Sequence, residues 1–349
     1  MHDELVTRDQ GAEMVGERVA GVDLDDVRLR DAGRKERRQA SENRESHPHR
    51  RPPSEPARVY QKIGPNGRGL SRYACAVSNV HGVGIGLRWE LAEDLFREQP
   101  SAVHWLEIHP ENYIERAGFY ELQLERARER YPIVTHGLTL CLGNADAPER
   151  TYVRQLRELI RTIGSSWHSE HLCWSGSEGA FLHDLLPLPQ TLEAAKRAAA
   201  RIDELRDALE VDVALENVST YAHPGPRGMS EIDFVLEVLD RSKGKMLLDV
   251  NNVWVNQNNH GIDAVSYIDR VPVDRVVQIH IAGHLVRSDG LIIDTHAEPV
   301  AEGVRALLAH TMKRMPNVPV LLERDGNYPP FDELVAEVQA LGAIVEAAR

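Results

Sequence analysis

Seven apolar, β-prone stretches of this chain each run directly into a histidine, a glutamate or an aspartate. The stretches are VHWLEIH, PIVTH, SSWHSEH, VDVALEN, GKMLLDV, RVVQIH and NVPVLLE, and the side chains at their ends are His109, His136, Glu170, Glu216, Asp249, His280 and Glu323. An eighth stretch, GVGIGLR, precedes them at about residues 82–88. Because helical patterns separate the eight stretches, the sequence predicts a (β/α)8 barrel with its functional side chains at the strand ends.

The segments between these stretches have the apolar spacing of amphipathic helices. We expect helices over residues 89–98, 118–130, 149–162, 191–209, 231–239, 262–269, 300–313 and 331–348. The strands themselves are apolar throughout, which is typical of parallel strands covered by helices. The loops at about residues 172–189 and 281–298 are longer than the others, and long loops at one end of a barrel usually shape the substrate site.

The composition argues against several classes of protein. A formal net charge of -13 disfavours a nucleic-acid partner, because nucleic acids bind basic surface patches. The 349 residues contain neither an apolar run long enough to span a membrane nor the pattern of a secretory signal, so we expect no membrane insertion and no export. The three cysteines have no CxxC spacing, which favours a reducing, cytoplasmic environment over a disulfide framework.

The first part of the chain differs from the rest. Residues 1–72 are rich in Arg, Glu and Asp, with several prolines, and we expect a disordered or weakly structured extension there. It is either the product of a start codon placed too far upstream or an arm that binds a partner. Residues 73–349 are expected to form one barrel domain, which holds the metal-binding and catalytic residues.

The residue types at the strand ends favour a metal centre. A single buried histidine is usually structural, and His104 and His168, inside their stretches, fit that role. Three histidines and four carboxylates at separate strand ends are harder to explain by packing, because a buried carboxylate is costly unless it is paired or bound to metal. Asp294 and His296 add a D-x-H pair whose side chains can face one side of an extended segment. So many ligands exceed the needs of one ion and favour two or three ions bridged by carboxylates.

Further polar residues lie near these positions. Asn217 and Asn252 are next to expected ligands and could bind metal or orient a ligand, whereas Asn256, Asn258 and Asn259 are interpreted as turn and cap residues. The remaining candidates for orienting ligands or contacting substrate are Asn112, His171, His183 and His284. Cys141 and Cys173 follow strand ends, and we interpret them as small packing residues.

Several long strings together resemble one known family. They are GVGIGLR, LEIHPENY, THGLTLCLGNAD, SEHLCWSG, LLPLPQT, LENVSTY, LLDVNNVWVNQNNHG, IHIAGH, DTHAEPV and LLERDGNYPPFDEL, and they cover about residues 80–334. These strings are similar to those of the multinuclear non-haem iron-dependent oxidative enzymes, which include the methanobactin-biosynthesis oxidase and were long described only as an uncharacterised bacterial family. The resemblance does not reach residues 1–72.

The resemblance implies more than the residues alone. It implies a xylose-isomerase-like barrel holding two or three iron ions, with dioxygen as co-substrate. The substrate it implies is a ribosomally made peptide containing cysteine, in some cases recruited by a small partner protein. The matching ligand positions are His109, His136, Glu170, Glu216, Asp249, His280, Asp294, His296 and Glu323, with Asp249, His280 and Glu216 taken as catalytic. Glu170 and Arg324 stand where some members carry Asp and Trp, which affects ligand reach and the substrate pocket.

Two other classes of function stay open on the sequence. The same ligands would serve a zinc- or manganese-dependent hydrolase or a sugar-isomerase-type enzyme on the same barrel. A non-catalytic protein that binds metal or peptide would also carry them. Iron content and dioxygen consumption distinguish these classes from the oxidase.

Overall fold

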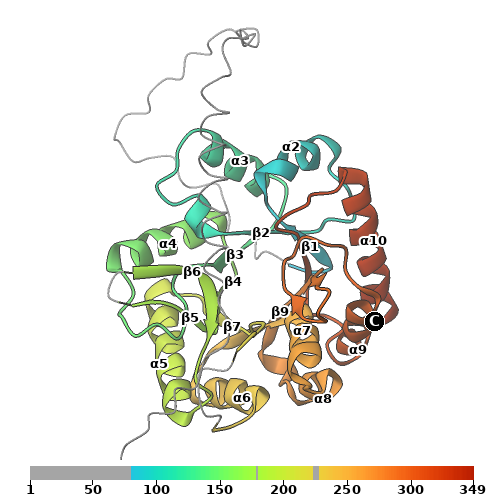
Figure 1. Ribbon diagram of the computed structural model, residues 1–349. Helices are drawn as coiled ribbons and strands as arrows, with labels where there is room; N and C mark the ends of the chain where they lie inside the picture. The colour runs from blue at the N-terminus through green and yellow to red at the C-terminus, as the bar shows by residue number, and fades with distance from the viewer. Residues whose placement is uncertain (1–79, 178–179, 223–227) are drawn as a thin grey trace, which may run out of the picture. The chain divides into compact units, whose positions relative to one another are not determined.

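The computed structural model describes residues 80–177, 180–222 and 228–349 of the chain. Within these residues, strands of uniformly parallel pairing close into a barrel in the order β1-β12-β9-β8-β7-β4-β3-β2 (Figure 1). The barrel strands are β1 (Val83–Gly86), β2 (Leu106–Ile108), β3 (Ile133–Gly137), β4 (Trp167–His171), β7 (Asp212–Glu216), β8 (Lys245–Asp249), β9 (Val276–Ala282) and β12 (Val320–Glu323). The predicted (β/α)8 barrel is therefore confirmed.

Helices surround the barrel and cover its outer face (Figure 1). They are α2 (Trp89–Glu98), α3 (Phe119–Arg128), α4 (Arg150–Ile163), α5 (Leu192–Leu209), α6 (Glu231–Arg241), α7 (Val250–His260), α8 (Ala264–Arg270), α9 (Glu302–Arg314) and α10 (Phe331–Ala347), with the short 3-10 turns η1 (Pro110–Asn112) and η2 (Val273–Arg275). Side-chain caps begin several of them: Thr191, Ser230 and Asp263 each accept a hydrogen bond from a first-turn backbone N–H. All the helices expected from the sequence are present within a few residues of their predicted bounds.

Alternation along the strands sorts side chains between the inside of the barrel and the layer under the helices. At the bottom of the barrel, Trp105, Val134, Trp167 and Leu321 form a buried cluster. Gly84 makes room for it, because a Cβ at that position would lie 2.5 Å from the Trp105 indole. The apolar bottom closes the barrel, so polar side chains two and four residues further along the same strands gather at its carboxyl end.

Helix α7 is the main departure from the sequence prediction. Asn256, Asn258 and Asn259 were expected in turns or caps, yet they lie in the middle and last turn of this helix. Asn256 is fully buried, and its amide donates to the Val218 carbonyl and to Glu231 while its oxygen accepts from the Thr220 backbone N–H. These tertiary hydrogen bonds outweigh the weak helix propensity of asparagine.

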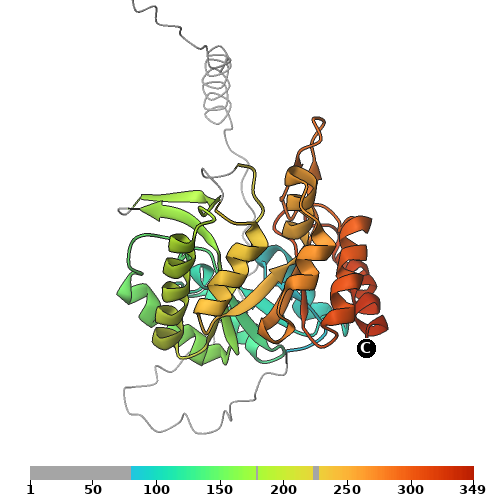
Figure 2. The same cartoon turned by 90° about the horizontal axis from the view of Figure 1, so that it is seen from below.

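Both long loops contain antiparallel hairpins. One is formed by β5 (Cys173–Ser177) and β6 (Ala180–Pro187), the other by β10 (Leu285–Val286) and β11 (Ile292–Ile293). Figure 2 shows both hairpins at the same end of the barrel.

No helix within the described residues is long and apolar enough to cross a membrane. The extension at residues 1–72 lies outside the described residues, so its boundary stays a prediction. The cytoplasmic location of the protein also stays a prediction.

Candidate metal centre

Strand register brings the polar ends of the barrel strands to one level. His171 of β4 pairs with Glu216 of β7, and Asp249 of β8 pairs with His280 of β9. Because all these strands run parallel, their carboxyl ends meet around the same opening. The described residues contain three groups of histidines and carboxylates close enough to share an ion: His136, His171 and Glu216; Glu216, Asp249, His280 and Glu323; and His296, Glu323 and Asp325.

The first group consists of buried residues. The Nε2 atoms of His136 and His171 are 3.2 Å apart, and each is 3.3 Å from Glu216 Oε2. The other ring nitrogen of His136 lies 2.9 Å from the Ser169 hydroxyl, which fixes the orientation of the ring. Both imidazoles therefore present Nε2 to the same point as the carboxylate.

The second group is centred on His280, which is fully buried. Its Nδ1 lies 3.2 Å from Glu216 Oε1 and 3.1 Å from Glu323 Oε2. Its Nε2 is 3.1 Å from Glu107 Oε2, an arrangement in which a carboxylate holds the rear of a ligand histidine. Gln278 donates to the same Glu107 oxygen and accepts from the Trp167 indole, so the contact extends into the barrel interior.

Asp249 belongs to the second group and also caps helix α7. Its Oδ1 accepts a 2.6 Å hydrogen bond from the Asn252 backbone N–H, which leaves Oδ2 for the cluster. The Asn217 side chain bonds both the N–H and the carbonyl of Asp249, and the Asn252 side chain donates to the Asn217 carbonyl. Both asparagines thus hold the backbone that positions Asp249.

The third group lies nearer the surface. His296 places Nδ1 3.1 Å from Asp325 Oδ2 and 3.3 Å from Glu323 Oε2. Its Nε2 is 2.8 Å from Asp294 Oδ1, so the two side chains of the D-x-H pair contact each other, although Asp294 belongs to none of the three groups. His296 has a φ of 49°, an uncommon conformation outside glycine, which its backbone hydrogen bond with Asp325 helps to hold. Arg88 binds Asp325 from the far side at 2.7 Å.

A chain of hydrogen bonds supports Asp294. The Asn251 amide donates to Asp294 Oδ1 at 2.7 Å, and the Asn251 oxygen lies 2.8 Å from His284 Nδ1. The Ser219 hydroxyl donates to Asp294 Oδ2 at 3.2 Å. His284 therefore acts on the cluster through Asn251 and does not reach the three groups itself.

The three groups fit metal ions. Ligands about 2.1 Å from an ion lie roughly 3.0 to 3.4 Å from one another in octahedral or tetrahedral coordination, and the contacts within the groups measure 3.1 to 3.3 Å. Four atoms at the centre have no hydrogen-bond partner among the described residues: Glu216 Oε2, Asp249 Oδ2, His280 Nδ1 and Glu323 Oε2. A buried polar atom without a partner costs about 1–3 kcal/mol, which a bound ion would remove.

Crowding of buried acids and bases displaces their pKa values in opposite directions. Burial, together with Glu216 and Asp294, raises the pKa of Asp249 well above its ordinary value. Burial and the neighbouring His171 and His280 lower the pKa of His136 well below its ordinary value, which keeps the imidazole neutral as a ligand must be. Strong shifts of opposite sign in one cleft are typical of a functional site.

Glu170 does not join the three groups. It lies one residue before His171 on β4 and therefore points to the other face of the strand. There its carboxylate contacts His168 Nε2 at 3.1 Å and accepts the Cys141 backbone N–H. Gly137 makes the space for it, since a Cβ there would lie 1.9 Å from Glu170 Oε1.

A cavity of about 520 Å³ opens above the groups. His109 lies on its wall, with Nδ1 3.1 Å from the His136 carbonyl, and Asn112 lines it as well. The hairpin strand β6 contributes Leu182 and Leu185 to the wall, and both are substantially exposed. His183 is on the same strand, but its side chain lies outside the described residues.

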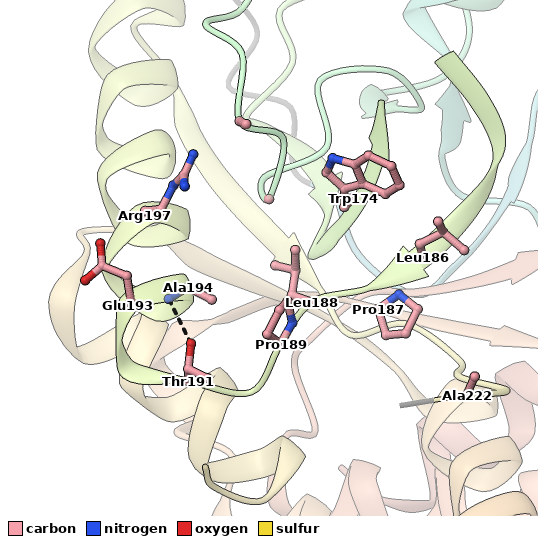
Figure 3. A pocket seen from close by; sticks show the side chains of 12 residues that line it. Trp174, Leu186, Pro187, Leu188, Pro189, Thr191, Glu193, Ala194, Arg197 and Ala222 are labelled. Atoms are coloured by element: carbon pink, nitrogen blue, oxygen red, sulfur yellow. Dashed lines mark hydrogen bonds between the residues drawn. The ribbon is translucent and has the colours of Figure 1, made fainter. Parts of the chain in front are cut away.

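A second cavity, of about 650 Å³, lies between hairpin residues and the start of α5 (Figure 3). Its lining is mostly apolar, with Trp174, Leu186 and Leu188 from the hairpin region. Arg197 and Glu193 of α5 stand at its edge (Figure 3). Hairpin β5–β6 thus takes part in the walls of both cavities.

Four residues near the groups were not singled out as ligands or their supports in the sequence. His171 was considered only as an orienting or substrate-contacting residue, and Asp325, Glu107 and Gln278 were not considered. A signal for three of them was present. Glu107-x-His109, Gln278-x-His280 and Glu323-x-Asp325 repeat the spacing of Asp294-x-His296, which places both side chains on one face of a strand.

Curated relatives match nearly the whole described chain. A UPF0276 protein of Caulobacter vibrioides is 39% identical over 268 residues, which cover 77% of this chain and 95% of the relative. A UPF0276 protein of Haemophilus influenzae is 39% identical over 293 residues, covering 76% and 95%. One from Nitrosospira multiformis is 40% identical over 262 residues, covering 75% and 92%.

Solved structures with low identity share the fold. A xylose isomerase-like TIM barrel protein from Mycobacterium smegmatis, in complex with magnesium, has a TM-score of 0.52 at 10% identity and covers 78% of this chain and 99% of its own. The 3-keto-D-glucoside 4-epimerase of E. coli has a TM-score of 0.51 at 13% identity, covering 75% and 99%. These likenesses confirm the expected xylose-isomerase-like barrel.

The family comparison agrees with the strings found in the sequence. Residues 82–346 match the family described as RiPP precursor modification enzyme MbnB/TglH/ChrH, where RiPP denotes a ribosomally synthesised and post-translationally modified peptide. That match spans the whole barrel, including every residue of the three groups. The chain belongs to this family of RiPP precursor modification enzymes.

Proposed function

We propose that the protein is a multinuclear non-haem iron-dependent oxidase that acts with dioxygen on cysteine residues of a ribosomally made peptide. The observation that supports this most directly is the sharing of carboxylates among the three groups, with Glu216 in the first and second and Glu323 in the second and third. A carboxylate has two oxygens and can bridge two ions, so adjacent sites can act as one centre. Imidazole and carboxylate ligands suit iron.

The residues that would hold the ions divide among the three groups. His136 and His171 would hold one buried ion, and Asp249 and His280 the central one, which shares a carboxylate with each neighbour. His296 with Asp325 would hold the outer one. Asp294 contacts His296 and would support the outer ion. When bound, such a centre supplies the electrons for dioxygen chemistry and a Lewis-acid position for a thiolate.

The chain's own residues would fix the geometry around that centre. Glu107 and Ser169 hold the outward-facing ring nitrogens of His280 and His136, so both rings keep one orientation. His109 commits Nδ1 to the His136 carbonyl, which leaves Nε2 free to bind an ion or a substrate group at the cavity wall. The apolar bottom of the barrel excludes water from beneath the centre.

The cavity above the groups suits part of a peptide chain. Its volume of about 520 Å³ holds a few residues, and the wall combines exposed leucines with polar side chains. A cysteine side chain of a peptide would reach the groups between His109 and His296, which both line the cavity. Membership of a peptide-modifying family supports a peptide as substrate, and a small recruiting partner protein is part of the proposal.

Metal content of protein purified without oxygen tests the proposal. Elemental analysis and Mössbauer spectroscopy should find two or three iron ions per chain with spin coupling between them. A fully active enzyme with stoichiometric zinc or manganese and no iron would overturn the oxidase in favour of a hydrolase or isomerase. Metal binding without any turnover would instead indicate a binding protein.

Dioxygen uptake provides the second test. The probe is a short cysteine-containing peptide sought among the genes adjacent to this one, with its cysteine-to-serine form as matched control. Uptake should depend on the cysteine and should disappear in His280→Ala and Asp249→Ala variants. Full activity in those variants with metal still bound would contradict the assignment of the centre.

A further inference from the structure

Two cysteines with no role in the proposed metal groups lie in direct contact. The sulfurs of Cys141 and Cys173 are 3.4 Å apart, and both side chains are fully buried. Cys141 follows β3, and Cys173 begins the hairpin strand β5. The sequence led us to interpret both as packing residues, but packing alone does not require two thiols to face each other.

The backbone holds the two cysteines opposite each other. The Leu142 N–H donates to the His171 carbonyl at 3.0 Å, and the Gly143 N–H donates to the Cys173 carbonyl at 2.9 Å. Cys141 itself adopts a φ of 32°, a conformation that side-chain-bearing residues rarely adopt, so the local fold imposes its position. The backbone conformation therefore places the two sulfurs in contact.

Apolar and polar groups both surround the pair: the Glu170 carboxylate accepts the Cys141 N–H, and Cys141 Sγ donates to the Leu138 carbonyl. Val218 packs against both cysteines in a small buried cluster. The Ser175 hydroxyl donates to Cys141 Sγ at 2.9 Å, and Cys173 Sγ donates to the same atom. Cys141 Sγ thus accepts two hydrogen bonds, whereas Cys173 Sγ donates one of them, so the two sulfurs have different surroundings.

Chain neighbours of the pair line both cavities. Ser175 lines the cavity above the metal groups, whereas Gly143 and Trp174 line the second, apolar cavity. A bond between the cysteines would join the loop after β3 to the hairpin that contributes to both walls. The state of the pair would therefore determine whether these two segments can separate.

We propose that Cys141 and Cys173 form a two-electron redox site that closes to a disulfide under peroxide. The S–S bond of a disulfide is about 2.05 Å long, so the sulfurs need to approach by roughly 1.4 Å. In closing, both S–H bonds break and one S–S bond forms, while the peroxide O–O bond breaks and takes up the two protons and two electrons as two waters. A dithiol or glutathione reverses the step.

Peroxide is the oxidant that suits this location. It is small enough to reach a buried pair, whereas a protein oxidant is not. Any enzyme that reduces dioxygen incompletely releases peroxide beside its own active site, and Ser175 joins the pair to that cavity. The proposal itself rests on the two cysteines and does not depend on which metal the groups hold.

Peptide mapping of the full-length chain tests the site. The protein is treated with a slight excess of hydrogen peroxide or, in parallel, of the thiol oxidant diamide. A first alkylating reagent then labels the accessible thiols of the folded protein. After denaturation, a second reagent labels the remaining thiols, and the protein is digested. We expect a linked peptide joining Cys141 and Cys173, a loss of two hydrogens from the intact mass, and full reversal by dithiothreitol. Recovery of both cysteines with the second alkylating label after either oxidant would overturn the proposal.

Cysteine variants provide the controls. Cys75→Ser should leave the linked peptide at its wild-type yield, because the third cysteine takes no part. Cys173→Ser should abolish the link and leave a sulfenic acid on Cys141 that dimedone traps, with circular dichroism confirming that the variant folds. A dimedone adduct on wild-type Cys141 in place of the link would show two independent thiols and would also overturn the proposal.

Discussion

Two sets of carboxylates occupy the carboxyl end of the barrel, and their surroundings differ. Glu216 and Glu323 face histidine nitrogens and other carboxylates, and each has an oxygen without a hydrogen-bond partner among the described residues. Glu170 and Glu111 meet donors instead. Glu111 Oε1 accepts the Leu138 N–H and two hydroxyls, although its Oε2 has no hydrogen-bond partner among the described residues. Glu170 accepts the Cys141 N–H with one oxygen and contacts His168 with the other.

The contrast shows how to separate ligands from structural acids in this barrel. A carboxylate that accepts hydrogen bonds from N–H and O–H donors needs no metal ion, because each donor replaces a water molecule that was lost on burial. One that meets other acceptors at 3.1 to 3.3 Å is stable only with a cation or protons between them. The first set therefore belongs to the proposed metal centre and the second to the fold.

Removing the carboxylate shared by the two buried groups should have the largest effect. Glu216→Ala takes a ligand from two ions at once, so we expect the two buried sites to lose metal and dioxygen consumption to fall by about 10³-fold or more. Elemental analysis and oxygen-electrode measurements check this. Unchanged metal content would place Glu216 with the structural acids and break the comparison.

The outer group should lose its ion alone. Asp325 is exposed compared with the inner ligands and serves one group, so Asp325→Asn should weaken one metal site by about 100-fold while the other two keep their ions. Anaerobic iron titration followed by Mössbauer spectroscopy resolves the sites. Loss of all the ions together would show that the three groups behave as a single unit.

The residue behind His280 should have a smaller effect on metal binding. Glu107→Gln keeps the size of the side chain but removes the charge that holds Nε2 of His280, so we expect metal affinity at the central site to fall by about 10-fold. Competition with a chelator measures it. An affinity equal to that of the wild type would show that Glu107 is a structural acid only.

Glu170 is the matched test from the other set. In Glu170→Gln one oxygen becomes an amide donor that cannot accept from both His168 and the Cys141 N–H, so we expect about 1–2 kcal/mol of destabilisation with metal content unchanged. Urea unfolding and elemental analysis together give both readouts. Loss of an ion would make Glu170 a ligand, as the resemblance implied.

A buried carboxylate outside the three groups should make the free energy of unfolding depend on pH. Burial raises the pKa of Glu231 to about 7 from an ordinary value of 4.5, so the folded chain binds a proton that the unfolded chain releases between these values. The contribution of Glu231 to the free energy of unfolding is therefore complete below pH 4.5 and is lost as the pH rises through 7. Because the side chain is only partly buried, we expect a decrease on the order of 1–2 kcal/mol.

The measurement compares wild type with Glu231→Gln by urea unfolding of the metal-free chain at pH 5 and pH 8. The variant should lose this part of the pH dependence while its other titrating groups remain. An equal pH dependence in both proteins would mean that Glu231 titrates alike in the folded and unfolded chains.

The sequence alone predicted the barrel because its signal is local. Apolar strand stretches, the helical spacing between them and the polar residue at each strand end are all properties of short segments. Helix α7 was missed, since Asn256 has weak helix propensity and is held by Val218, Thr220 and Glu231 from elsewhere in the chain. Distant partners of this kind leave no mark in the local pattern.

Among the expected site residues, the sequence by itself determined which strand ends carry ligand-type side chains. Only the tertiary structure decided which of two neighbours faces inward: His171 enters the barrel and Glu170 does not, because successive side chains on a strand alternate. Only tertiary structure also brought Asp325 beside His296, and the Cys141 sulfur against that of Cys173. Residue type is written in the chain, but the inward direction and the partner depend on register and barrel closure, which arise when distant strands pair.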